Sequence, residues 1–87
     1  MWGEIVNIES LQSLMLNDNG FAFHPTTGES FQCSETGVAV IRQLLHGTPE
    51  EDLAIQIAGE FDVDVAIAER DIDGFLLNLK ELQLITI

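Results

Sequence analysis

Cys33, His24 and His46 are the side chains of this 87-residue chain whose types could form a thiol nucleophile or a zinc site. A thiol beside an imidazole can act as a nucleophile. The hairpin expected over residues 21–33 places Cys33 and His24 on opposite faces, so no such dyad is predicted. The three residues also lack a zinc-binding spacing, and no further ligands complete a set. The sequence predicts no catalytic residue, no metal ligand and no cofactor, and Cys33 is expected to be a small buried side chain.

The charge of the chain is strongly unbalanced, with 15 acidic residues, three basic residues and a formal net charge of -12. Such a chain repels nucleic acid phosphates and anionic membrane surfaces, and it favours a basic or apolar partner. The acidic residues are densest from residue 50 to 73, where a solvated surface is expected. Asp62 and Asp64 could bind calcium weakly, but their segment lacks the length and the glycine of an EF-hand loop, so no calcium site is predicted. No nucleic acid or membrane partner is therefore predicted.

Length and composition predict one small domain over residues 1–87. Apolar residues make up 46% of the chain, which is ordinary for a globular protein and outside the range of disordered chains. No apolar run is long enough for a membrane span, and Met1–Glu4 lacks the basic segment of a signal peptide. A single cysteine fits a reducing compartment. We therefore expect a cytoplasmic protein.

Three segments are expected to form one small antiparallel sheet: residues 12–16, 21–24 and 29–33. A helix over residues 8–16 competes with the first strand. Asn17–Gly20 is a strong turn signal between the first two strands. Residues 1–10 are compatible with either a strand or an irregular arm, and the pattern does not choose between them.

The turn between the second and third strands sets the register of the hairpin. Pro25–Gly28 suits a type I turn closed by its glycine in the left-handed conformation. A hairpin turn of this type has a three-residue loop, and a loop of that length places Phe23 opposite Phe31. The same register places Phe21 opposite Cys33. Three phenyl rings and the thiol then share one face, and we expect this face to pack on helices.

Three amphipathic helices are expected after the sheet, near residues 35–46, 49–61 and 65–82. Ser34 is a natural N-cap of the first helix, and His46-Gly47 ends it. Thr48–Glu51 begins the second helix with a cap, a proline at the first helical position and a glutamate at the third. Leu84–Ile87 is a β-prone tail.

A three-stranded antiparallel N-terminal sheet followed by three helices is an α+β, winged-helix-like arrangement. Such a fold leaves function open, including DNA binding, but the net charge of -12 argues against DNA. Gly74, inside the third helix, costs roughly 1 kcal/mol relative to alanine. It either lets another backbone approach the helix or packs closely against the protein's own sheet.

Several short motifs follow one another in a fixed order along residues 20–85. They are Thr27-Gly28, Phe31, Thr36-Gly37, Phe61-Asp62-Val63-Asp64, Glu69-Arg70-Asp71, Phe75-Leu76 and the ending Leu79 to Ile85. Together they resemble the PqqD family of peptide-binding domains. The main departure is Cys33-Ser34, where the family usually has Leu-Asn. Cysteine can replace the apolar residue and serine can replace asparagine as a cap, so the implied fold is unchanged.

The resemblance implies a non-catalytic adaptor, not an enzyme. Such an adaptor binds the leader of a ribosomally made precursor peptide by strand addition and presents it to a modifying enzyme, often a radical SAM enzyme. The resemblance implies no cofactor and leaves homodimer formation open. The alternative is a winged-helix regulatory or protein-interaction module that is not tied to a peptide substrate.

The peptide site is expected along the free edge of the third strand and on the outward side of the third helix. In that site we expect Ile67 and Leu77 as apolar anchors, Asp71 as the partner of a basic or hydroxyl group, and Gly74 as the place of closest approach. The full set of expected peptide-binding residues is Glu29, Ser30, Phe31, Gln32, Cys33, Ile67, Arg70, Asp71, Gly74, Leu77 and Asn78.

Overall fold

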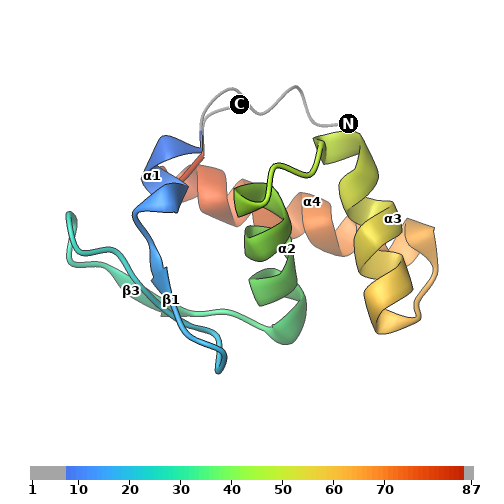
Figure 1. The fold of residues 1–87 in the computed structure, drawn as a ribbon, viewed down its shortest axis with the longest axis horizontal. Helices are drawn as coiled ribbons and strands as arrows, with labels where there is room; N and C mark the ends of the chain where they lie inside the picture. The colour runs from blue at the N-terminus through green and yellow to red at the C-terminus, as the bar shows by residue number, and fades with distance from the viewer. Residues whose placement is uncertain (1–7, 86–87) are drawn as a thin grey trace.

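The computed structural model describes residues 8–85 of the chain. Its elements, in chain order, are the helix α1 (Glu9–Gln12), the strands β1 (Met15–Leu16), β2 (Phe21–Phe23) and β3 (Ser30–Gln32), and the helices α2 (Glu35–Leu45), α3 (Glu50–Phe61) and α4 (Val65–Glu81). Figure 1 shows the sheet at one end of the molecule, α3 at the other end and α2 between them. A three-stranded sheet followed by three helices confirms the predicted α+β arrangement.

Residues 9–16 contain both a helix and a strand, the two structures that competed for this segment in the sequence analysis. Residues 9–12 form α1, and β1 consists of only Met15 and Leu16. Leu11 and Leu14 are both buried, because a helical turn brings residues three apart onto one side. The strand expected over 12–16 is therefore shorter than predicted.

The strands pair in the order β1-β2-β3, and both pairs are antiparallel. β2 is the central strand, as the sequence predicts. The register of β2 with β3 differs by one residue from the expected register. Phe31 lies opposite Ala22 rather than Phe23, and Phe21 lies opposite Gln32.

The loop between β2 and β3 accounts for the changed register. The His24 amide donates to the Glu29 carbonyl at 2.8 Å, so this pair closes a loop of four residues rather than three. The Gly28 amide then donates to the His24 carbonyl at 2.8 Å. Gly28 has the expected left-handed conformation, with a φ of 78°. One additional loop residue moves every cross-strand pair by one position.

The new register reverses the faces of two phenylalanines. Ala22 is fully buried, and Phe31 packs against the core together with Cys33. Phe21 is 46% exposed on the other face, and Phe23 shares that face because side chains alternate along a strand. The prediction that the three rings pack together on the helices is therefore wrong for Phe21 and Phe23, whereas it holds for Phe31.

The helices begin and end within about one residue of the predicted positions, inside the usual uncertainty of helix boundaries. Ser34 caps α2 by accepting a hydrogen bond from the Gly37 amide at 3.1 Å. Gly47 follows α2 with a φ of 90°, a conformation that favours glycine. Thr48 does not cap α3, contrary to the prediction, because α3 begins one residue later than expected, with Pro49 as its N-cap instead of its first helical residue. The Thr48 hydroxyl donates to Gln43 Oε1 at 2.6 Å instead.

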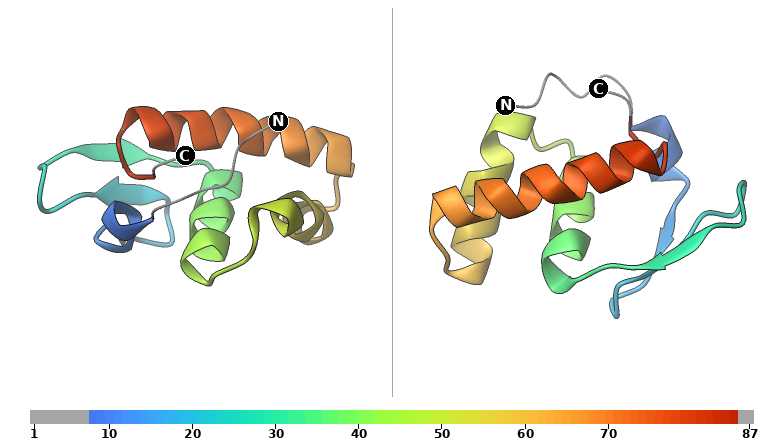
Figure 2. Two further views of the ribbon diagram at one scale, coloured as in Figure 1. Left: turned by 90° about the horizontal axis from the view of Figure 1, so that it is seen from above. Right: turned by 180° about the vertical axis from the view of Figure 1, so that it is seen from behind.

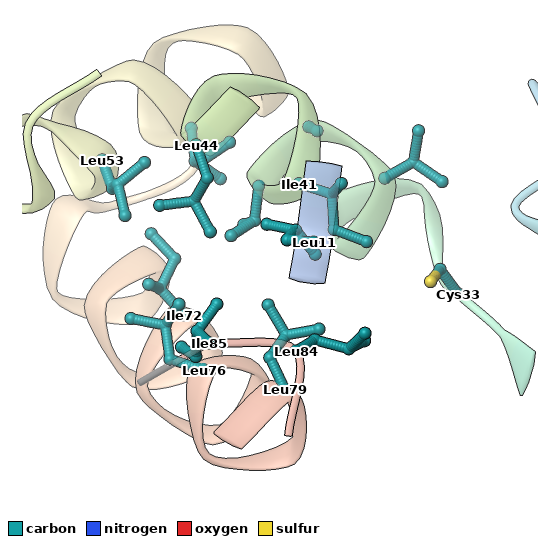
Figure 3. Packing of buried hydrophobic residues seen from close by; sticks show 14 of the residues in the cluster. Leu11, Cys33, Ile41, Leu44, Leu53, Ile72, Leu76, Leu79, Leu84 and Ile85 are labelled. Carbon is teal, nitrogen blue, oxygen red and sulfur yellow. The ribbon is translucent and has the colours of Figure 1, made fainter. Parts of the chain in front are cut away.

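One apolar core joins the helices to the sheet. Figure 3 shows Leu44 of α2, Leu53 of α3 and Leu76 of α4 pointing into this core. Leu84–Ile85, directly after α4, is buried there as well. The first half of the predicted β-prone tail therefore packs on the core without forming a strand, and residues 86–87 lie outside the described residues.

Candidate functional site

The outer edge of β3 is not hydrogen bonded to any other strand of residues 8–85. The Glu29 carbonyl and the Cys33 amide both bond toward β2, at 2.8 and 2.7 Å. Because bonded pairs alternate along an antiparallel ladder, the backbone N–H and C=O groups of Ser30 and Gln32 point to the open edge. This edge therefore offers donors and acceptors to one further strand.

Phe75 of α4 connects that helix to the end of β3. A Cβ atom at Gly37, in the first turn of α2, would lie 2.9 Å from Phe75 Cε1 and 3.4 Å from Cys33 Cβ. The ring therefore packs over the backbone of α2, beside the residue that follows β3. Figure 2 (left) shows α4 on the side of the sheet where β3 lies. The open edge of β3 and the Phe75 side of α4 thus form two sides of one candidate surface.

Helical geometry places four of the expected α4 residues on this side. Asp71 lies four residues before Phe75 and Asn78 lies three residues after it, so both share its side of the helix. Ile67 and Gly74 come next around the helix. Ile67 is 47% exposed, and apart from the neighbouring backbone of α4 no atom lies within 4 Å of a Cβ built on Gly74. This open space is not compatible with the expected alternative that Gly74 packs closely on the protein's own sheet.

Arg70 and Leu77 lie on the opposite side of α4 from Phe75. Leu77 is two residues beyond Phe75, which corresponds to about 160° around the helix. It is 45% exposed there. We therefore define the β3–α4 surface as Glu29–Cys33 together with Ile67, Asp71, Gly74 and Asn78. Arg70 and Leu77, four residues before and three residues after Gly74, border this surface on the side away from Phe75 and stay predicted peptide contacts.

Comparison with known proteins identifies the family of this chain. The family model described as coenzyme PQQ synthesis protein D (PqqD) matches residues 5–85. This chain belongs to the PqqD family. The solved structure of TbiB1 in complex with the TbiA(beta) leader peptide is similar to this chain, with a TM-score of 0.74 and 25% sequence identity. The match covers 95% of this chain and 94% of that chain. No individually curated protein gives a significant match.

The β3–α4 surface of this PqqD-family chain carries two exposed carboxylates, Glu29 and Asp71, but no reactive thiol. Asp71 is exposed on the side of α4 that Phe75 shares. Burial raises the pKa of the Cys33 thiol, so it stays protonated at neutral pH and is a poor nucleophile. Within residues 8–85, no group of three or more His, Cys, Asp or Glu side chains is placed to hold a metal ion.

His24 and Cys33 of this PqqD-family chain do not form the dyad considered from the sequence, but the reason differs from the expected one. In the observed register both residues lie on the core-facing side of the hairpin, so the expectation of opposite faces is wrong. His24 pairs with Glu29 at the loop end of the hairpin, and Cys33 lies four residues after Glu29 at the other end of the hairpin. That spacing separates the two by roughly 13 Å.

Ser10 and His24 form a contact that sequence reasoning missed. Ser10 Oγ lies 3.1 Å from His24 Nε2, although the two residues are distant in the chain. The Thr26 amide donates to His24 Nδ1 at 3.3 Å, so Nε2 carries the ring hydrogen and donates to Ser10. A nucleophilic serine requires an Nε2 that accepts its proton. The contact therefore attaches α1 to the hairpin and does not activate Ser10.

Phe75 and Gly37 are the residues of the site that sequence reasoning did not select. Both belong to motifs that carry the family resemblance, but no local pattern connects a glycine of α2 with a ring of α4. The sequence signal that could have pointed to Gly37 was its position in the first turn of a helix, where a small residue permits close packing.

Proposed function

We propose that this PqqD-family protein is a non-catalytic adaptor that binds the leader of a ribosomally made precursor peptide and presents it to a modifying enzyme. The observation that carries the proposal is the open edge of β3 beside the Phe75 side of α4. The similarity to TbiB1, whose solved structure contains a leader peptide, supports the same function. The leader is added to β3 as a fourth strand.

Backbone hydrogen bonds supply most of the affinity in this proposal. Ser30 and Gln32 present their N–H and C=O groups to the added strand. Side chains of α4 give specificity: Ile67 contacts an apolar leader residue, and Asp71 pairs with a basic or hydroxyl group. Gly74 is where the leader backbone comes closest to the helix, because no atom outside the neighbouring backbone of α4 lies within 4 Å of its missing Cβ position.

Charge favours a leader that carries Lys or Arg. The chain has a net charge of -12, and Asp71 lies on the proposed binding surface. Attraction between exposed charges is screened over roughly 8 Å at physiological ionic strength. Leader affinity should therefore fall as the salt concentration rises, mainly through a slower association rate.

The proposed partners follow from the same reasoning. The modifying enzyme is of the type that works with PqqD-like adaptors, in many cases a radical SAM enzyme, and the site of action is the cytoplasm. No helix of residues 8–85 is long and apolar enough to span a membrane. The winged-helix regulator considered from the sequence is not favoured, because a chain of net charge -12 repels DNA.

Isothermal titration of the protein with its precursor leader tests the proposal. Gly74→Leu should weaken leader affinity about tenfold or more, because the new side chain occupies the approach path of the backbone. Gly59→Leu is the matched control, since Gly59 is also a helical glycine with open space around it. It should bind the leader like the wild type. Absence of wild-type binding would contradict the adaptor function, and wild-type affinity of Gly74→Leu would contradict the assigned site.

A further inference from the structure

We infer that the outer face of the sheet is the docking surface for the modifying enzyme, and that a bound leader completes this surface. The inference rests on the proposed adaptor function. The outer sheet face consists of Met15, Phe21, Phe23, Ser30 and Gln32, which are cross-strand neighbours on the side of the sheet that faces away from the core.

The outer sheet face exposes apolar side chains that the fold does not use. Met15 is 62% exposed and Phe21 is 46% exposed, whereas Leu14 and Ala22, their neighbours in sequence, are buried. Met15 lies directly opposite Phe23, so the apolar side chains adjoin one another. A soluble domain rarely leaves adjoining large apolar side chains in water unless they serve an interaction.

The outer sheet face carries no charge, although the chain has a net charge of -12. All five of its residues are uncharged. The exposed carboxylates nearest to it, Asp18 and Glu29, lie in the β1–β2 turn and directly before β3, and further exposed carboxylates are distributed over α3 and α4. Basic partners are therefore attracted elsewhere on the molecule. The partner that fits this face presents an apolar, uncharged surface, because a charged group would lose its hydration there without gaining an ion pair.

The charge of the chain argues against a second copy as the occupant of the outer sheet face, and the small size of the face means that it cannot support stable docking alone. A stable protein interface uses roughly 20 to 30 residues on each side. The face supplies five, and two copies that approached through it would also bring together two chains of net charge -12. A further contribution of surface is needed for stable docking.

A leader strand paired with β3 supplies that contribution. Side chains alternate between the two faces of a sheet, so every second leader residue lies beside Ser30 and Gln32 on the outer sheet face. The modifying enzyme then contacts Phe21 and the leader at the same time. Its affinity for the adaptor–leader complex exceeds its affinity for the empty adaptor, by about fivefold or more if the coupling is typical.

The test uses the full-length adaptor, its precursor leader and the enzyme that modifies that precursor, with binding measured by biolayer interferometry. The double variant Met15→Ser/Phe21→Ser removes the largest exposed side chains of the face without changing the β3 edge. We expect leader affinity to stay within about twofold of the wild type and enzyme affinity for the complex to fall about tenfold or more. Ile55→Ser on α3 is the control, because Ile55 is 60% exposed but distant from the sheet.

Other outcomes would overturn the inference. Unchanged enzyme affinity in the double variant, or equal loss in Ile55→Ser, would show that docking occurs elsewhere. Equal enzyme affinity for empty and leader-loaded adaptor would show that the leader does not complete the surface. A dimer by sedimentation that the double variant abolishes would assign the face to a second copy. Since leader affinity is measured separately, each of these results leaves the adaptor function itself intact.

Discussion

Replacing Gly37 with alanine tests whether α4 is attached to the end of β3 through Phe75. An alanine Cβ at this position would lie 2.9 Å from Phe75 Cε1 and 3.2 Å from Phe75 Cζ. Both distances are shorter than ordinary van der Waals contact, so the ring must move outward. Gly59 and Gly74 provide matched controls, because they are helical glycines with no atom beyond the neighbouring backbone of their own helix within 4 Å of an added Cβ.

The expected magnitudes follow from two opposing effects. Alanine in a helix interior is more favourable than glycine by roughly 0.8–1.0 kcal/mol, so Gly59→Ala and Gly74→Ala should each increase stability by up to about 1 kcal/mol. Gly37→Ala gains at most the same amount but overpacks the contact with Phe75, which costs about 1–3 kcal/mol. Its net effect should be between about zero and a loss of 3 kcal/mol.

Urea unfolding followed by far-ultraviolet circular dichroism measures these differences, with thermal melting as a second readout. For a domain of this size, 1 kcal/mol shifts the melting temperature by roughly 4–8 °C. The controls should melt higher than the wild type, and Gly37→Ala should melt at or below it. If Gly37→Ala were stabilised as much as Gly59→Ala, Phe75 would not pack over Gly37, and the connection between α4 and β3 would be wrong.

Three further predictions test the register, a helix end and the buried thiol. Phe21→Ala should lower the free energy of unfolding by less than about 1 kcal/mol, whereas Leu79→Ala, at a fully buried position, should lower it by about 2–5 kcal/mol. Equal losses of stability in urea unfolding would instead support the register expected from the sequence. Gln83→Gly should raise stability by about 1 kcal/mol in the same assay, because Gln83 ends α4 with a φ of 62°, and a loss would contradict that conformation. Burial raises the pKa of Cys33, so the unfolded chain releases the thiol proton first and stability should fall as the pH rises above about 8.5. Cys33→Ala should remove this part of the pH dependence, and an unchanged slope would locate it elsewhere.

The helices could be predicted from the sequence because their apolar residues repeat every three to four positions over long segments. Ser34 was a reliable signal for the start of α2, and its side chain does accept the Gly37 amide. α1 was less predictable. Leu11 and Leu14 fit a helical turn, while the residues that follow fit a strand, and both patterns proved to be present in succession.

The hairpin register could not be predicted because one backbone hydrogen bond decides it. Whether the His24 amide bonds to the Glu29 carbonyl fixes the number of loop residues, and Pro25–Gly28 suits a loop of either length. The open edge of β3 did follow from the sequence, since it depends only on strand order. The packing of Phe75 over Gly37 did not, because a glycine in the first turn of α2 indicates close packing but does not indicate which residue of another helix packs there.

The central claim is that a leader peptide binds as a strand on the β3–α4 surface, and a titration monitored by amide chemical shifts tests it most directly. As the precursor leader is added, the largest shifts should occur at residues 29–33 and along α4 between Ile67 and Asn78. The amides of Ser30 and Gln32 should also become protected from hydrogen exchange, because they donate to the added strand. Shifts concentrated on α3, around residues 50–60, would show that the acidic helix binds the peptide and would contradict strand addition to β3.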